Sequence, residues 1–140
     1  MKSVPFQTSH WAELTANGLP LGVELSQSEI QQIEATGKAH TIVDEKGVPL
    51  ACGGVVQYWK GRFEAWAIFD KERAKSRMVG IIRIMRDFLA RVRGRVEAAV
   101  RIGNFSDLRT ALVLGFAMET LCAKCYLPDG ADCSILVRIS

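Results

Sequence analysis

The chain has 140 residues, of which 49% are hydrophobic and 24% are charged, and its formal net charge is +3. This length predicts a single domain over residues 1–140 that can bury a core without disulfides or metals, and the mildly basic charge gives little support to nucleic-acid binding. The most apolar run, residues 78–89, is interrupted by Arg83, Arg86 and Asp87, so no segment is expected to cross a membrane.

The first half of the chain predicts two helices followed by three strands. Residues 8–17 fit a helix capped by Thr8 or Ser9, residues 18–25 fit a loop, and residues 26–36 fit a helix that ends at Gly37. Residues 40–44 and 48–56 fit a hairpin, in which Gly53-Gly54 indicates a bulge or a close backbone approach. Residues 62–69 alternate as a third strand, which places Arg62, Glu64, Trp66 and Ile68 on one face.

The second half predicts a long helix, a strand, a short helix and a closing hairpin. Apolar residues at helical spacing mark a helix over residues 78–92, and residues 95–102 alternate as a strand. Asn104 with Asp107 caps a short helix whose expected buried side is Phe105, Leu108, Ala111 and Leu112, and Gly115 supplies its left-handed exit. Residues 116–126 and 132–139 fit a hairpin. We find no internal repeat. The order predicts an α/β (α+β) fold with a mixed parallel and antiparallel sheet flanked by helices.

The four cysteines favour free thiols over a metal site. Cys122 and Cys125 have the spacing of half a zinc site, but no second pair follows and neither histidine is near. Buried thiols in a sheet are the expected state. Because residues 1–10 lack the apolar stretch of a secretion signal, we expect a cytoplasmic protein.

Three stretches resemble the GNAT family of N-acetyltransferases. They are the strand GRFEAWAIF running into the helix SRMVGIIRIMRDFLARV, the strand that ends at Asn104 before a short helix, and Leu114-Gly115-Phe116 opening a strand. The resemblance extends from about residue 40 to the end. The closing YLPDGADCSILVRI and the chain length also resemble small GNAT-like proteins of tailed bacteriophages.

The resemblance implies a site for acetyl-coenzyme A as co-substrate. In the family the coenzyme lies where two parallel strands splay apart, here 62–69 and 95–102, with its pyrophosphate at the start of the long helix. The residues carried over are Ala67, Phe69, Arg77, Met78, Val79, Gly80, Ile81 and Asn104. The family's loop pattern ends in a small residue where this chain has Ile82. The basic segment KERAKSR before the helix fits either phosphate binding or a solvated loop.

Catalysis is represented by one candidate, Glu64, on the strand that carries the general base in many relatives. The alternative is a structural carboxylate paired with Arg62, Arg95 or Arg101. The tyrosine that often serves as the acid in this family is replaced by Ala111. His10 and His40 are expected to be structural or surface residues rather than catalytic bases.

Two function classes therefore stay open. One is direct acetyl transfer to an amine. The other is a GNAT-fold protein without turnover that binds a host protein or a virion protein, for which an exposed Tyr58-Trp59 pair would be a contact. No metal and no nucleic acid are expected, and a free sheet edge near residues 132–139 could pair with a second copy to form a dimer.

Overall fold

A computed structural model describes residues 1–16 and 25–140. The strands within these residues are β1 (Lys2–Pro5), β2 (Ala39–Val43), β3 (Pro49–Trp59), β4 (Arg62–Phe69), β5 (Arg95–Arg101), β6 (Ala117–Ala123) and β7 (Cys133–Ile139). The helices are α1 (Thr8–Leu14), α2 (Gln27–Thr36), α3 (Lys71–Ala74), the 3₁₀ turn η1 (Lys75–Arg77), α4 (Met78–Leu89) and α5 (Phe105–Val113).

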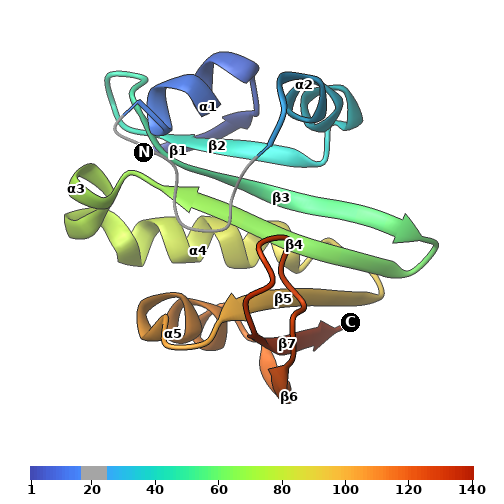
Figure 1. The fold of residues 1–140 in the computed structure, drawn as a ribbon. Coiled ribbons are helices and arrows are strands. Elements are labelled where there is room, and N and C mark those ends of the chain that lie inside the picture. Colours follow the sequence, from blue (N-terminus) through green and yellow to red (C-terminus); the bar gives the residue numbers. More distant parts are fainter. Residues whose placement is uncertain (17–24) are drawn as a thin grey trace. The chain divides into compact units, whose positions relative to one another are not determined.

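The described strands form one sheet in the order β1-β2-β3-β4-β5-β7-β6 (Figure 1). β4 and β5 run parallel, whereas β1 with β2, β2 with β3, β5 with β7 and β6 with β7 are antiparallel. The parallel pair is the one joined through α4, as a strand–helix–strand connection requires. This confirms the predicted mixed sheet. The described residues fall into two compact units, residues 1–56 with 66–84 and residues 57–65 with 85–140.

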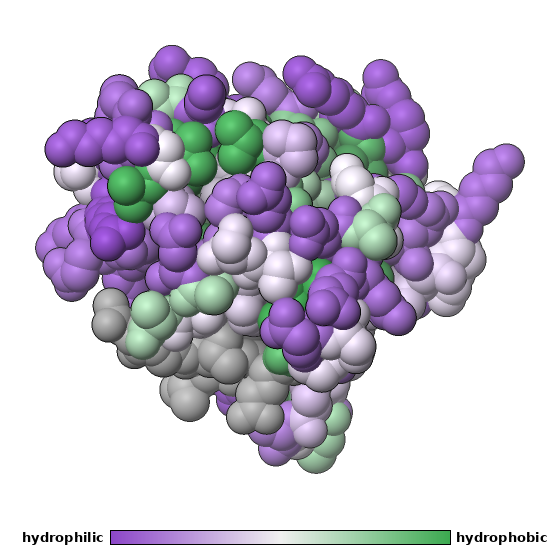
Figure 2. Space-filling model, turned by 90° about the horizontal axis from the view of Figure 1, so that it is seen from above, coloured by the Kyte–Doolittle hydropathy of each residue, from purple (hydrophilic) through white to green (hydrophobic). Residues whose placement is uncertain are grey.

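The first unit begins with a strand that the sequence analysis missed. β1 pairs with β2 from Lys2↔Val43 to Pro5↔His40. Helices α1 and α2 lie beside these strands (Figure 1) and bury an apolar cluster against them. The outer face of the two helices is mainly hydrophilic (Figure 2). The cluster consists of Phe6, Trp11, Leu14, Ile30, Ala39, Cys52 and Ile68.

The predicted helix caps of this unit are partly confirmed. α2 begins after Ser26, whose hydroxyl accepts the Glu29 N–H at 3.2 Å, and it ends at Gly37 with φ 66°. The cap of α1 is Gln7, not Thr8 or Ser9, and it forms a capping box with His10. The expected helix end at Asn17 and the loop at residues 18–24 lie outside the described residues.

The Gly53-Gly54 pair marks a close backbone approach, one of its two predicted meanings. A Cβ on Gly53 would lie 2.6 Å from the carbonyl oxygen of Trp66, and one on Gly54 would lie 2.3 Å from that of Lys38. Side chains at either position would separate β3 from its neighbours, so glycine is required here.

The basic segment before the long helix is helical rather than a loop. Asp70 caps α3 by accepting the N–H groups of Glu72 and Arg73 at 3.1 and 3.0 Å. Residues 71–77 then continue through η1 into α4, with right-handed helical dihedrals at Ala74, Lys75 and Met78. The chain is therefore already helical when it reaches Met78.

The second unit carries the parallel pair and the closing hairpin. β5 pairs with residues 62–64 of β4 on one side and with the whole of β7 on the other. β7 is thus an inner strand, and the prediction of a free edge near 132–139 was wrong, because β6 forms that edge. The β6–β7 register shifts twice, between Met118 and Thr120 and between Thr120 and Ala123.

The short helix α5 confirms its cap but not all of its buried side. Asn104 accepts the Asp107 N–H at 3.1 Å, and Gly115 takes a φ of 94°. Ala111 is buried, but Phe105 and Leu112 are 73% and 51% exposed, so their predicted burial was wrong. No helix within the described residues is long and apolar enough to span a membrane.

Candidate functional site

A short repeat in the sequence stands in register across the parallel strands of the second unit. Gly-Arg-Phe-Glu-Ala begins at Gly61 and Gly-Arg-Val-Glu-Ala begins at Gly94. Their residues are direct partners, with Arg62 opposite Arg95 and Glu64 opposite Glu97. This five-residue similarity is too short to be a structural repeat, and the sequence analysis did not single it out. Two arginines and two glutamates face the same way, because residues two apart on a strand share a face.

Both arginines form ion pairs with the same glutamate, Glu97. Arg62 Nε lies 2.6 Å from Glu97 Oε2, and Arg95 reaches Glu97 Oε1 at 3.2 Å. Arg95 also pairs with Glu119 of β6 at 2.5 and 2.8 Å. Glu97 is largely buried, with a side chain 12% exposed. Glu64 makes no ion pair within the described residues, so the predicted alternative pairing with Arg62, Arg95 or Arg101 does not occur.

The partner of Glu64 is a neutral phenol. The hydroxyl of Tyr58 on β3 donates to Glu64 Oε2. This hydrogen bond to a carboxylate raises the pKa of Tyr58 to about 12, with burial as a second cause. Arg62 stacks on the rings of Tyr58 and Trp59, with its Cζ 4.8 and 4.5 Å from their centroids. Tyr58 and Trp59 are 52% and 61% exposed, so this pair is not part of the core.

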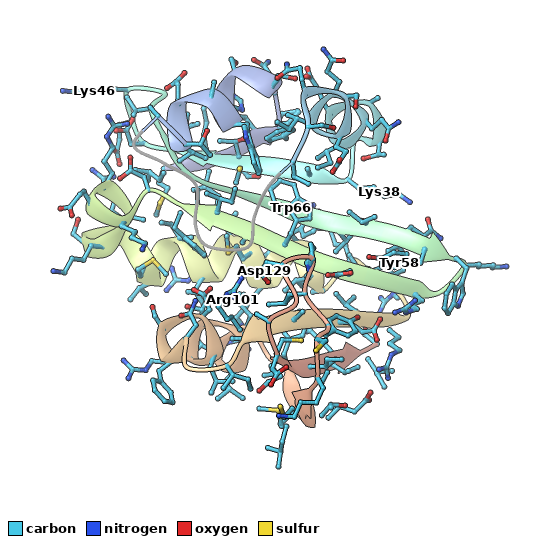
Figure 3. All side chains as sticks on the ribbon, in the orientation of Figure 1. Lys38, Lys46, Tyr58, Trp66, Arg101 and Asp129 are labelled. Atoms are coloured by element: carbon cyan, nitrogen blue, oxygen red, sulfur yellow. The ribbon has the colours of Figure 1, made fainter. Side chains whose placement is uncertain are left out.

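The β6–β7 loop contributes the second tyrosine of the chain. Burial and then the charge of Glu64 raise the pKa of Tyr126. The loop is tied to β5 by Arg101, whose guanidinium lies 2.7 Å from Asp129 Oδ2 (Figure 3). Asp132 accepts the Cys125 N–H at 2.9 Å and fixes the start of the loop. The aromatic hydroxyls of Tyr58 and Tyr126 therefore both lie within the electrostatic reach of Glu64.

A separate group surrounds the start of α4 in the first unit. Arg77 donates to both carboxylate oxygens of Glu45 at 2.9 and 2.8 Å. The backbone N–H of Glu45 itself and then Arg77 lower the pKa of Glu45 to about 2. The methyl carbon of Met1 lies over Gly80, 2.1 Å from where a Cβ would stand. Among the residues that the structure describes, and apart from the helix's own neighbouring turns, only Met1 comes within 4 Å of that position.

The other residues carried over from the resemblance are distributed between the units. In the first unit Ala67 and Val79 are exposed, Phe69 and Met78 are half-buried, and Ile81 is fully buried. Ile81 therefore packs into the core rather than facing solvent. Ile82 is half-buried. Asn104 belongs to the second unit, where its amide group caps α5 and donates to Asp107 at 2.7 Å.

Aromatic side chains gather on the α1 side of β4 in the first unit. Trp66 makes edge contacts with Phe6 and Trp11, with ring centroids 5.9 and 6.1 Å apart. The indole N–H of Trp66 is buried and has no hydrogen-bond partner within the described residues. His10 bonds to Thr41 at 2.8 Å, and His40 contacts Ser3 at 3.4 Å, as expected of structural histidines.

The cysteines are free thiols, but their burial differs from the expectation. Cys52 and Cys133 are buried, whereas Cys122 and Cys125 are exposed. Cys125 stands after the end of β6 with a φ of 51°, because the strand is shorter than predicted. Within the part of the chain that the structure describes, no group of three potential ligands could hold a metal ion.

The residues that determine the partner of Glu64 were not predicted from the sequence. Neither Glu97 nor the hydroxyl of Tyr58 was predicted to act on this carboxylate. The repeat of Arg-x-Glu at residues 62–64 and 95–97 was the available signal, because identical short motifs on successive parallel strands can align. No sequence signal indicated that Glu45 would hold Arg77, since the two are 32 residues apart.

Comparison with solved structures identifies the fold. The chain is similar to Ard1 from Thermoplasma volcanium, with a TM-score of 0.76 at 16% identity over 99% of this chain and 96% of that one. It is similar to a GNAT superfamily phosphinothricin acetyltransferase from Sinorhizobium meliloti in complex with AcCoA, with a TM-score of 0.74 at 16% identity over 98% and 86% of the two chains. A spermidine N-acetyltransferase chimera of Vibrio cholerae SpeG and hSSAT gives 0.70 at 10% identity over 99% and 96%.

These neighbours share the mixed sheet flanked by helices, so the chain has the fold of the GNAT acetyltransferases. At the level of sequence, no protein-family model matches the chain. No curated protein matches it either.

Proposed function

We propose that the chain is an acyl-coenzyme A-dependent N-acyltransferase that moves the acetyl group of acetyl-coenzyme A to an amine. The observation that carries the proposal is that Glu64 forms no ion pair within the described residues. On a fold shared with acetyltransferases, this carboxylate lies on the strand expected to hold the base, and no arginine among the described residues forms an ion pair with it. A carboxylate paired with arginine is a weaker base, because the positive charge favours its ionised form.

The reaction needs one proton to leave the acceptor and one to reach the leaving group. The amine nitrogen bonds to the thioester carbonyl carbon, and the carbon–sulfur bond then breaks. Glu64 takes a proton from the amine nitrogen as that nitrogen bonds to the carbonyl carbon, directly or through water, and the coenzyme thiolate takes up a proton from solvent as it leaves. Tyr58 is poorly suited to give that proton, because a phenol with a pKa of about 12 is a weak acid and its hydroxyl already donates to Glu64.

The start of α4 supports a place for the coenzyme phosphates. Arg77 supplies a guanidinium suited to a phosphate, and Gly80 leaves the helix surface open to a close approach. Two contacts must change first, since Glu45 holds Arg77 and Met1 covers Gly80. The Glu45 side chain is 65% exposed and can turn into solvent, and the Met1 methyl is the end of a flexible side chain that can move aside. The AcCoA bound to the Sinorhizobium meliloti neighbour supports the choice of ligand.

The proposal is tested by binding and by turnover. Isothermal titration with acetyl-coenzyme A, beside desulfo-coenzyme A, measures the donor site. Transfer to a panel of amines, peptide termini and lysine peptides is followed by mass spectrometry, because Cys122 and Cys125 are exposed and would react in a thiol-release assay. Glu64→Gln should bind acetyl-coenzyme A as the wild type does and lose about a hundredfold or more in transfer. Equal transfer rates in wild type and Glu64→Gln would remove Glu64 from the reaction.

A second candidate is a GNAT-fold protein without turnover that binds a host or virion protein, as the resemblance to phage proteins implies. The occupied state of Arg77 and Gly80 favours it, and so does the buried Ala111 at the position of the family's acid. Absence of acetyl-coenzyme A binding at millimolar concentration, in both the wild type and Glu45→Gln, would favour this candidate. A cytoplasmic location fits either function.

A further inference from the structure

The two Arg-x-Glu segments of β4 and β5 are equivalent in sequence but not in the contacts they make. Both arginines pair with Glu97, at 2.6 and 3.2 Å, and neither pairs with Glu64. Arg62 and Glu64 share a face and are two residues apart on one strand, so Arg62 is a ready partner for Glu64 as well. The choice of Arg62 between these two carboxylates decides whether Glu64 stays free of positive charge.

Arg62 bonds to Glu97 of β5 on one side of β4 and stacks on aromatic rings of β3 on the other. Its Nε bonds to Glu97 Oε2, and its guanidinium lies against the rings of Tyr58 and Trp59. Glu97 is the better partner because it is the more buried, with a side chain 12% exposed, and charged contacts strengthen as water is excluded. Arg95 cannot compensate Glu97 fully, because its other nitrogen is engaged by Glu119 at 2.8 Å. The charge of the buried Glu97 carboxylate is therefore balanced mainly by Arg62.

We propose that Glu97 is a positioning residue, which draws Arg62 away from Glu64 and so leaves Glu64 with the Tyr58 hydroxyl alone. The proposal deepens the function proposed above and rests on it for its effect on acetyl transfer. Its structural half, the capture of Arg62 by Glu97, does not depend on that function. The carboxylate groups and cations that face Tyr58 are Glu64 and Arg62 of β4, and Tyr126 of the β6–β7 loop adds a further phenol.

The chain allows the contact to be observed without any enzymatic assay, because Tyr58 and Tyr126 are its only tyrosines. In a Tyr126→Phe background, the absorbance of phenolate near 295 nm reports Tyr58 alone. Glu97→Gln should release Arg62 toward Glu64 and weaken the bond from Tyr58, so that the phenol titrates at lower pH, toward its ordinary range. The double variant Arg62→Gln/Glu97→Gln removes the competing guanidinium and should return the titration at least to that of the background, because Arg62 itself lowers the pKa of Tyr58.

Glu119→Gln is the matched control. It removes a carboxylate partner of Arg95 on the same sheet but leaves the pair of Arg62 with Glu97 intact, and should not move the titration. Circular dichroism at each pH verifies that the chain is folded. Should Glu97→Gln fail to fold, Glu97→Asp keeps the charge but withdraws the carboxylate from Arg62, and it should shift the phenol in the same direction by a smaller amount.

The same variants test the proposed effect of Glu97 on acetyl transfer. Glu97→Gln should lower the rate of transfer at least about tenfold at saturating substrates, and the double variant should recover most of it. A purely structural role for Glu97 predicts no recovery when Arg62 is also removed. A folded Glu97→Gln with an unchanged phenol titration, or a double variant that does not restore it, would overturn the proposal. If the wild type transfers no acetyl group, the proposed function fails, and the titration still decides whether Glu97 captures Arg62.

Discussion

Gly80 offers a substitution for which stability and ligand binding should change in opposite directions. It lies in the first turn of α4, within the helical range of dihedrals, where alanine is preferred over glycine by about 0.5–1 kcal/mol. A Cβ there would lie 2.1 Å from the methyl carbon of Met1 and 3.6 Å from its sulfur. The methyl carbon is the far end of a flexible side chain, so it can move aside at little cost.

The expected change in free energy of unfolding follows from these two terms. Alanine at position 80 gains the helix preference and loses part of the contact made by one methyl group, which is worth no more than about 0.8 kcal/mol. We therefore expect Gly80→Ala to range from neutral to about 1 kcal/mol more stable, with a melting temperature raised by at most about 5 °C. Urea denaturation with a tryptophan fluorescence readout measures it.

Acetyl-coenzyme A binding should respond in the opposite sense. If the glycine leaves room for a phosphate, Gly80→Ala should weaken binding in isothermal titration, and Gly80→Glu should abolish it through bulk and charge. Both chains should remain folded. The placement of the phosphates is refuted if folded Gly80→Glu binds acetyl-coenzyme A as the wild type does. The packing argument is refuted if Gly80→Ala loses more than about 1 kcal/mol.

Three further predictions concern other parts of the chain. Glu64 raises the pKa of Tyr58 to about 12, so the hydrogen bond between them stabilises the fold fully below about pH 10 and this stabilisation is lost as the pH rises toward 12. In Glu64→Gln with Tyr126→Phe, the ionised fraction of Tyr58 at pH 11 should rise from about one tenth to well over half. An unchanged titration would contradict the hydrogen bond. Asn104→Ala should lower the free energy of unfolding by about 1 kcal/mol in urea, whereas Asn104→Asp should retain most of it. Ellman's reagent should modify the exposed Cys122 and Cys125 quickly in the native chain, and the buried Cys52 and Cys133 only after denaturation. Burial also raises the pKa of the Cys52 thiol to about 12. Fast reaction of a third thiol would contradict the burial.

Most of the fold could be predicted from local patterns. Apolar spacing predicted the long helix, alternation predicted strands at residues 62–69 and 95–102, and the caps at Ser26 and Asn104 predicted two helix starts; the second strand ends one residue earlier, at Arg101. Strand β1 escaped prediction because it is four residues long, ends in Pro5 and lies at an edge, where burial on one side only leaves little alternation. Its strand character comes from pairing with β2.

The burial of α5 and the state of Glu64 could not be predicted for a different reason. Phe105 is large and apolar yet 73% exposed, because a nine-residue helix turns only a narrow stripe toward the sheet. Whether Glu64 is paired depends on the register of β4 with β5 and on the burial of Glu97, which are tertiary properties. A sequence shows which charged side chains are available, but which of them pair depends on which are buried from solvent in the fold.

The two register shifts along β6 have a consequence for how the protein behaves at high concentration. An edge strand presents free N–H and C=O groups that can template the strand of another molecule, and β6 carries Leu121 with 75% of its surface exposed. Bulges bend and twist such an edge, so its hydrogen-bonding groups no longer form a straight row. The interruptions at Met118–Thr120 and Thr120–Ala123 therefore act against fibrous aggregation, and substitutions that straighten β6 should be screened for insoluble protein before any loss of activity is assigned to the site.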